Sequence, residues 1–147
     1  MQHSSALNAK GRLTIEQFDK DGNLIHTDKT TNVVVSDGLD YITSRMKDAT
    51  ATAMSHMAIG SGSTAAAGGD SALGSELGRV ALTSTAVSGA VVTYTATFGA
   101  GTGTGAVTEA GILNASSSGT LLCRTVFSVV NKGASDSMTI TWTVTVS

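Results

Sequence analysis

The residues best suited to chemistry in this chain are the few charged side chains of its second half, of which Glu109 is the most conspicuous. It interrupts a weakly apolar stretch in a region almost free of charge. General acid–base catalysis would need a second acid or base converging on Glu109, and the sequence offers no clear candidate. A carboxylate in a charge-poor sheet needs a cation, for which Arg79 and Arg124 are available, although Glu76 could instead pair with Arg79. We therefore predict that Glu109 forms a structural ion pair and is not catalytic.

The other residues capable of chemistry do not form recognisable sites. His3, His26 and His56 are scattered, and no two have the spacing of metal ligands on one helix or strand. Cys123 alternates with apolar residues and has no neighbouring base, which predicts a buried small side chain and not a nucleophile. Asp19–Gly22 is similar to part of a calcium loop, but a hairpin turn explains it better. No metal ligands are predicted.

Two glycine-rich segments, 60–62 and 101–105, superficially suggest phosphate-binding loops. Such a loop must be followed by a helix whose N-terminal amides point at the phosphate, and none is predicted after 101–105. The chain also has no Gly-Lys-Ser or Gly-Lys-Thr triplet. Both segments are interpreted as turns, so no cofactor is predicted.

The C-terminal segment Ser137–Ser147 is the strongest structural signal in the chain. Apolar and hydroxyl side chains alternate along it without interruption by Gly or Pro, which predicts a long β-strand with one buried face. The only tryptophan, Trp142, lies at the middle of the apolar side, between Ile140 and Val144. We predict that Trp142 is buried between two layers of sheet.

The rest of the chain predicts further strands and one helix. A helix should begin at Ser36 or Asp37, and its apolar stripe Leu39, Ile42 and Met46 should plug one end of the β structure. Residues 60–75 form a long Gly/Ala/Ser loop, of a length that is uncommon without a function. The other predicted strands are Arg12–Phe18, Leu24–Val35, Met54–Ile59, Arg79–Val87, Ala90–Phe98, Ala106–Ala115 and Thr120–Val130.

About eight strands and one short helix predict an all-β fold, an antiparallel β-sandwich of jelly-roll-like type. The length of 147 residues is suited to a single domain. We place that domain at residues 12–147. Residues 1–11 lack apolar periodicity and are interpreted as an extended arm, whose Leu7 could fill a pocket on a neighbouring protein.

Composition limits the classes of partner. A formal net charge of −2 gives no electrostatic reason to bind nucleic acid or an anionic membrane, and no apolar run approaches the length of a membrane span. A single cysteine fits synthesis in a reducing compartment. Thirteen of the twenty charged residues lie in residues 1–48. The charge-poor remainder predicts a surface partly covered by other protein.

Four segments together carry a resemblance to a known group of proteins. They are Thr31–Leu39 (TNVVVSDGL), Met57–Gly62 (MAIGSG), Asp70–Arg79 (DSALGSELGR) and Thr108–Asn114 (TEAGILN). With these segments, the chain from about residue 30 onwards resembles small virion proteins of tailed bacteriophages, namely capsid decoration (cement) and fibre-like proteins. The resemblance implies a β-rich module without enzyme activity that assembles symmetrically on a particle, and therefore a homo-oligomer.

The function expected from these observations is capsid decoration. The protein would be synthesised in the host cytoplasm, bind the outer surface of the phage head, reinforce contacts between major capsid subunits and reside in the virion. A tail, collar or fibre component is the first alternative. A carbohydrate-binding module for host adhesion is the second, although the chain has few aromatic residues to form a sugar platform.

Overall fold

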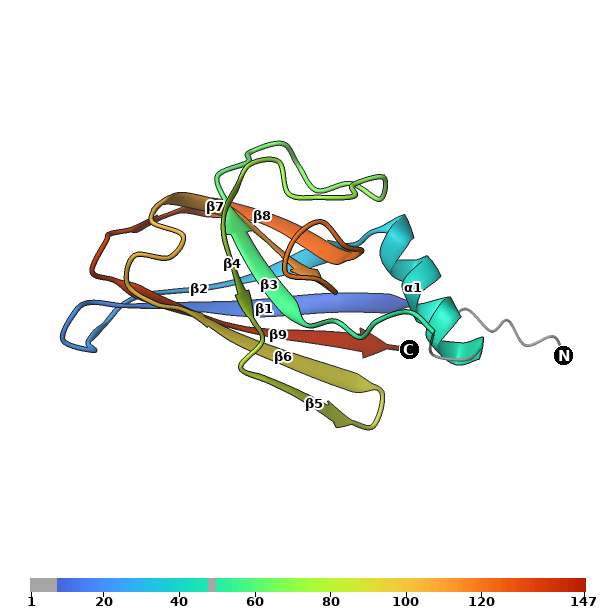
Figure 1. Ribbon diagram of the computed structural model, residues 1–147. Coiled ribbons are helices and arrows are strands. Elements are labelled where there is room, and N and C mark those ends of the chain that lie inside the picture. Colours follow the sequence, from blue (N-terminus) through green and yellow to red (C-terminus); the bar gives the residue numbers. More distant parts are fainter. Residues whose placement is uncertain (1–7, 48–49) are drawn as a thin grey trace, which may run out of the picture.

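The structure is a computed structural model that describes residues 8–47 and 50–147. Within these residues the chain forms nine strands and a single helix, so the predicted all-β class is confirmed. Figure 1 shows the strands gathered around a common core, with the helix at one end. The elements are β1 (Ala9–Phe18), β2 (Leu24–Val34), α1 (Ser36–Lys47), β3 (His56–Gly60), β4 (Glu76–Ala81), β5 (Ser84–Ser88), β6 (Val91–Phe98), β7 (Gly105–Leu113), β8 (Leu121–Lys132) and β9 (Ser137–Val146).

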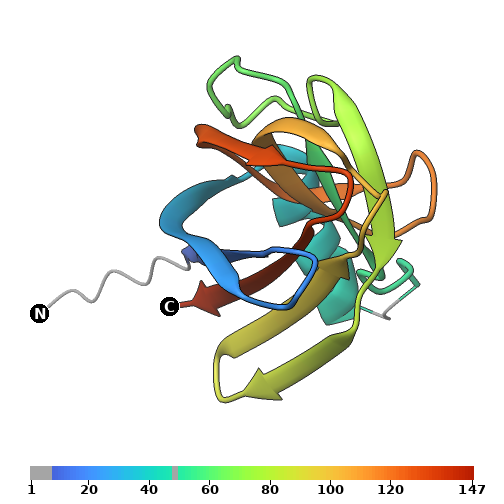
Figure 2. The same cartoon turned by 90° about the vertical axis from the view of Figure 1, so that its left-hand side faces the viewer.

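The strands form one antiparallel sheet in the order β4-β3-β7-β8-β2-β1-β9-β6-β5. The sheet is curled, because β2 pairs with β1 along most of its length but with β8 only through Val33 and Val34. Beyond that short contact β2 and β8 diverge, and Figure 2 shows the two halves of the sheet on opposite sides of the molecule. We refer to β4, β3, β7 and β8 as the loop half and to β1, β9, β6 and β5 as the threonine half.

The main core lies between these halves and contains the predicted tryptophan. Trp142 and Ile140 are fully buried and Val144 nearly so, which confirms the predicted inner face of β9. The indole Nε1 of Trp142 donates a hydrogen bond to Asn32 Oδ1 at 3.1 Å. Gly11 makes room for this contact, because a Cβ at that position would overlap the Asn32 carboxamide. The core continues across the loop half through Met57, Ile59, Ala110, Ile112, Cys123 and Phe127.

Helix α1 begins at Ser36 as predicted, but its predicted apolar stripe was correct only for Ile42. Leu39 is 48% exposed and Met46 is 74% exposed. The contact side of the helix carries Gly38 and Tyr41 together with Ile42. Tyr41 and Ile42 pack on the core, and Gly38 lies so close to the Leu122 carbonyl that a Cβ would not fit. The requirement for close approach at Gly38 therefore overrides the spacing of the larger apolar residues.

Two predicted boundaries also differ from the structure. The single predicted strand Arg79–Val87 is divided into β4 and β5, because the chain crosses from one half of the sheet to the other at this point. Strand β1 begins at Ala9, inside the predicted arm, and pairs there with Val146 of β9. Asn8 extends this pairing through two backbone hydrogen bonds to Ser147. Leu7 lies outside the described residues.

Candidate functional site: the buried ion pair beneath the 61–75 loop

The most concentrated set of polar contacts surrounds Glu109 on β7 and Arg124 on β8. Arg124 pairs with Gly111 across the ladder, so Glu109 and Arg124 are diagonal neighbours on one face of the sheet. Glu109 is fully buried and Arg124 is 2% exposed. Arg124 donates to Glu109 Oε1 from Nε at 3.0 Å and approaches it with Nη2 at 2.9 Å. The predicted ion pair of Glu109 is therefore confirmed, with Arg124 as its cation.

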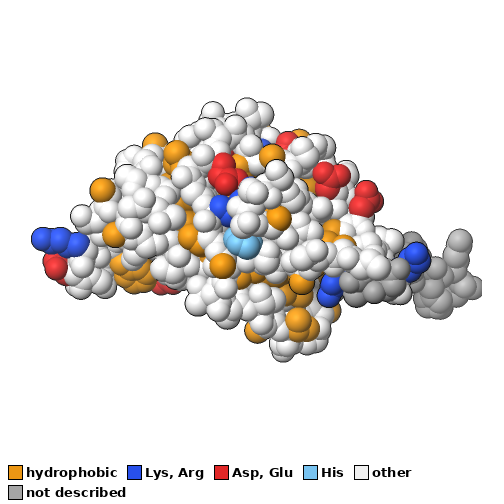
Figure 3. All heavy atoms as spheres, in the orientation of Figure 1, with side chains coloured by type: hydrophobic (Ala, Val, Ile, Leu, Met, Phe, Trp, Pro, Cys, Tyr) orange, Lys and Arg blue, Asp and Glu red, His pale blue; other side chains and the backbone are white. Residues whose placement is uncertain are grey.

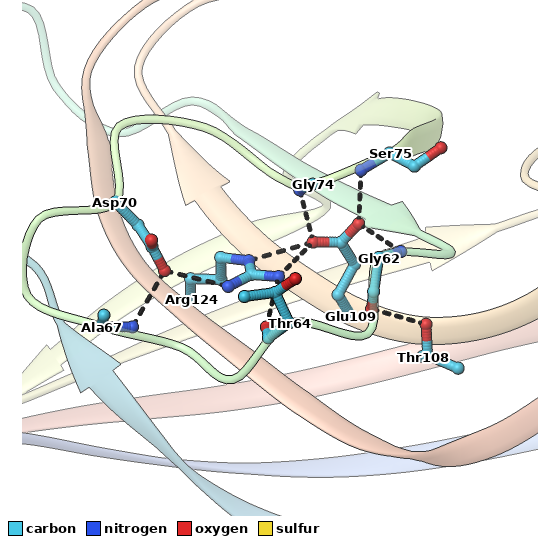
Figure 4. Close-up of polar contacts among 9 residues, drawn as sticks. All are labelled: Gly62, Thr64, Ala67, Asp70, Gly74, Ser75, Thr108, Glu109 and Arg124. Carbon is cyan, nitrogen blue, oxygen red and sulfur yellow. Dashed lines mark hydrogen bonds and ion pairs between the residues drawn. The ribbon is translucent and has the colours of Figure 1, made fainter.

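The Glu109 carboxylate also accepts three backbone hydrogen bonds from the 61–75 loop, the segment that joins β3 to β4. Gly62 and Ser75 donate to Oε2 at 2.6 and 2.7 Å, and Gly74 donates to Oε1 at 2.7 Å. Figure 4 shows these three amides converging on the carboxylate from the two ends of the loop. One side chain thus fixes both the entry and the exit of the loop.

Arg124 holds the middle of the same loop. Its Nη1 donates to Asp70 Oδ2 at 2.9 Å and its Nη2 donates to the carbonyl of Thr64 at 3.0 Å. Asp70 in turn accepts a hydrogen bond from the backbone amide of Ala67. The ion pair on the sheet and the acid in the loop therefore form one continuous network (Figure 4).

Small residues beneath the loop make this close approach possible. Gly60 faces Glu109 across the β3–β7 ladder. A Cβ on Gly60 or on Gly62 would overlap the Glu109 carboxylate. At Gly111 a Cβ would lie 2.9 Å from the side chain of Leu73, which packs inward from the loop. Because these positions lack side chains, the loop lies directly against the surface of the sheet.

The electrostatics of the site favour ionised carboxylates. Burial raises the pKa of Glu109, but the amides of Ser75, Gly74 and Gly62 together with Arg124 outweigh it, and the pKa is lowered overall. The pKa of Asp70 is also lowered, chiefly by the Ala67 amide. Because the Glu109 oxygens are occupied by loop amides and Arg124, this carboxylate is suited to holding the loop and not to transferring a proton.

The second predicted cation, Arg79, has a separate structural role. It pairs with Glu76 at 2.7 Å, the alternative contact recognised in the sequence. Its Nη1 also donates to the carbonyls of Ala115 and Ser118 in the turn between β7 and β8. Arg79 therefore fixes that turn and does not reach Glu109.

The sequence did not reveal a second buried cation, Lys132, at the end of β8. Its Nζ donates to the carbonyls of Gly99 and Asp136 at 2.9 and 2.8 Å, and burial lowers its pKa. Nearby, Gln17 donates to the Asn131 carbonyl and to the Asp136 carboxylate. The only sequence signal for this role is the position of Lys132 next to a turn. The signal is weak, because a lysine at a strand end is normally solvated.

The remaining candidates for chemistry do not assemble into a site among residues 8–47 and 50–147. Cys123 is buried, and its burial raises the pKa of the thiol, as expected for a packing residue. No three His, Cys, Asp or Glu side chains of this part of the chain lie close enough to hold a metal ion. No helix there is long and apolar enough to span a membrane.

Comparison with protein-family models, with curated proteins and with solved structures finds no match for this chain.

Proposed function

We propose that this protein is a structural component of a tailed-bacteriophage virion, a decoration protein that binds the outside of the head and reinforces contacts between major capsid subunits. The observation that carries the proposal is the outer face that β6 and β9 form within the threonine half. These strands present facing threonine pairs there, Thr93 with Thr143, Thr95 with Thr141 and Thr97 with Thr139. This part of the face is neutral and regular, although charged residues of β1 border it, and it fits burial against another protein with little cost of desolvating charge.

The rest of the surface supports the same proposal. Most of the face in Figure 3 is uncharged, with a few separated charged side chains. The 61–75 loop stands on the outer face of the other half, fixed at both ends by Glu109 and in the middle by Arg124. A fixed loop loses little conformational entropy when it contacts a partner, so it is a second candidate contact with the capsid.

The proposal also includes a fold assignment more specific than the all-β class. We infer a β-sandwich of jelly-roll-like type, with the loop half and the threonine half as its two layers. Support comes from the core, to which β1, β6 and β9 contribute from one side and β3, β7 and β8 from the other. The short connections from β6 to β7 and from β8 to β9 each run from one half to the other, as connections in a sandwich do.

Co-sedimentation with undecorated heads tests the proposed attachment. The full-length protein should pellet with heads, and Thr141→Glu should weaken this binding because it places a charge in the proposed contact. Ser117→Glu, at an exposed position in the turn between β7 and β8, adds the same charge on the other half of the sheet and should bind like the unmodified chain. Equal binding by both variants would move attachment to the 61–75 loop, and no binding at all would exclude head decoration.

The number of copies per virion separates the head from other locations. A decoration protein should be present in hundreds of copies, whereas a tail, collar or fibre component should be present in a few to about twenty, because virion parts follow the closed symmetry of their assemblies. Quantitative mass spectrometry of purified virions measures this directly. The carbohydrate-binding alternative is less favoured, since Trp142, Phe98, Tyr94 and Phe127 are buried and cannot form a sugar platform.

A further inference from the structure

Strand β5 is a free edge of the sheet. It is the last strand in the order and pairs with β6 alone among the described residues. All five of its residues are exposed, and Val87 is 72% exposed although it is a large apolar side chain. An edge strand presents a row of backbone N–H and C=O groups that another strand can pair with.

The opposite edge, β4, is protected against such pairing. It carries the charged residues Glu76 and Arg79, joined in an ion pair. Its pairing with β3 is irregular at Ile59 and Gly60. The loop that follows β6 lies against its middle, since a Cβ on Gly78 would fall 2.9 Å from the Gly103 nitrogen. Charges, irregular pairing and a covering loop are the features by which natural sheets prevent association at an edge.

The edges where β2 and β8 diverge are also protected. The free stretch of β2 carries Asp28 and Lys29. On β8, the side chain of Gln17 already occupies the carbonyl of Asn131. Strand β5 has none of these features, because residues 80–108 contain no Asp, Glu, Lys or Arg.

We propose that β5 is a self-association site that pairs with β5 of a second copy of this chain in antiparallel orientation about a twofold axis. The sequence of β5, STAVS, suits this arrangement. With Ala86 on the axis, Ser84 faces Ser88 and Thr85 faces Val87 of the other copy. Small and β-branched residues then lie opposite one another without bulk or charge repulsion. The two threonine halves become one continuous sheet.

The chemistry of the edge favours a second copy over an unrelated segment. A twofold contact uses one patch twice and must therefore be self-complementary. A neutral strand meets this condition, whereas a strand carrying one sign of charge would repel its copy. Figure 3 shows hydrophobic side chains at the lower edge of the molecule, where β5 lies in the view of Figure 1. Pairing would cover part of this apolar surface, including Val87.

The contact is small, so the association should be weak. Five residues a side bury less than the roughly 1,200–2,000 Å² of a stable complex. The isolated full-length chain should therefore dimerise reversibly between about 10 µM and 1 mM. This inference does not depend on the proposed function, because it concerns the purified protein alone.

Sedimentation velocity on charge variants at Ala86 tests the inference. Ala86 lies on the outer face of an exposed strand, so a charge there leaves the core intact. Ala86→Glu and Ala86→Lys should each sediment as monomers, because like charges meet at the axis. An equimolar mixture should recover association, since Glu then faces Lys. Thr145→Glu, an exposed site on β9 opposite Lys10, is the matched control and should associate like the unmodified chain.

Cross-linking gives a second, geometric measurement. Ala86→Cys should form an intermolecular disulfide under mild oxidation, because paired Cα atoms at the axis lie within disulfide range. Thr145→Cys should not, and Cys123 is buried. A full-length chain that stays monomeric at about 1 mM overturns the inference. Association that survives Ala86→Glu and leaves Ala86→Cys uncross-linked overturns it equally, because another surface must then be responsible.

Discussion

At the scale of single residues, the fold depends on a few polar side chains placed where water cannot reach them. Glu109 and Arg124 are both buried, and both form hydrogen bonds with the 61–75 loop, which has little apolar surface of its own. Leu73 is the main apolar residue with which that loop packs on the sheet. The ion pair therefore substitutes for a hydrophobic anchor, and its removal should release the loop.

Glu109→Gln tests this anchoring role. The substitution keeps the shape of the side chain but removes the buried charge that faces Arg124, whose remaining counter-ion is the partly exposed Asp70. We expect a loss of about 3 kcal/mol of unfolding free energy and cleavage of the 61–75 loop by proteases, since breaking a buried ion pair from one side is costly. Chemical denaturation and limited proteolysis measure these effects. The control Glu76→Gln breaks a partly exposed pair and should cost only about 0–1 kcal/mol. Equal losses in the two variants would contradict the anchoring role.

The same carboxylate predicts a pH dependence of stability. The folded state holds the pKa of Glu109 below its ordinary value of 4.5. Its contribution to stability is therefore fully present above that value and is lost as the pH falls through the lower pKa of the folded state. Unfolding free energies measured from neutral to acidic pH should show the unmodified chain converging towards Glu109→Gln. A constant difference between the two at all pH values would show that protonation of Glu109 does not matter.

Trp142→Ala tests the core. The side chain is fully buried between the halves of the sheet, so the substitution should cost about 3–5 kcal/mol through lost burial and the cavity left behind. Trp142→Phe keeps an aromatic ring but loses the hydrogen bond to Asn32, and should cost less. Both values come from chemical denaturation. A loss below about 1 kcal/mol for Trp142→Ala would mean that the core closes over the space without strain.

At the scale of secondary-structure elements, the ends of the strands decide how far each half extends. Strand β1 starts at Ala9 and pairs with β9 out to Val146. Helix α1 covers this end of the sheet (Figure 1). A largely apolar groove of about 330 Å³ remains between the helix and β6 and β9, lined in part by Tyr41, Met46 and Val144. The helix therefore closes the end incompletely.

Substitutions along α1 should reveal its contact side. Ile42 packs on the core and Met46 is largely exposed. We expect Ile42→Ala to cost about 1–2 kcal/mol, less than a fully buried residue, and Met46→Ala to change stability by less than about 0.5 kcal/mol. Thermal or chemical unfolding measures both. Equal losses at the two positions would restore the contact side predicted from the apolar stripe, which included both residues.

N-terminal truncations separate the strand from the segment before it. Removal of residues 1–7 leaves β1 complete and should leave the melting temperature unchanged. Removal of residues 1–11 deletes the pairing partners of Val144, Thr145 and Val146 and should lower it. If the proposed arm attaches to the head, the shorter truncation should weaken co-sedimentation with heads. Full head binding by that variant would assign attachment to the sheet face or to the 61–75 loop.

At the scale of the whole molecule, charge and neutral surface are separated. Charged residues concentrate in the first third of the chain, whereas β5, β6 and the outer side of β9 form a neutral surface of threonine and small residues. The threonine face and the β5 edge adjoin one another. Pairing of two chains through β5 would therefore double the width of the face that we propose to contact the capsid, and two weak contacts on one dimer bind more tightly than one.

The sequence alone determined the features that depend on local periodicity. Strict alternation in Ser137–Val146 decided which side of β9 is apolar and so placed Trp142 inside. The Asp-Gly turn joined β1 to β2, and the position of Ser36 marked the start of α1. These signals are strong because side-chain direction in a strand has a period of two, and because turn residues have distinct backbone preferences.

Only the tertiary structure decided which residues meet. Arg79 and Arg124 were equal candidates for Glu109, and the β7–β8 register chose Arg124. The amides of Gly62, Gly74 and Ser75 come from a loop without periodicity, so its path depends on the carboxylate that it surrounds. The contact side of α1 depended on the close approach of Gly38 to Leu122. Periodicity determines the direction of a side chain, whereas its neighbours follow from strand order and from the space that small residues leave.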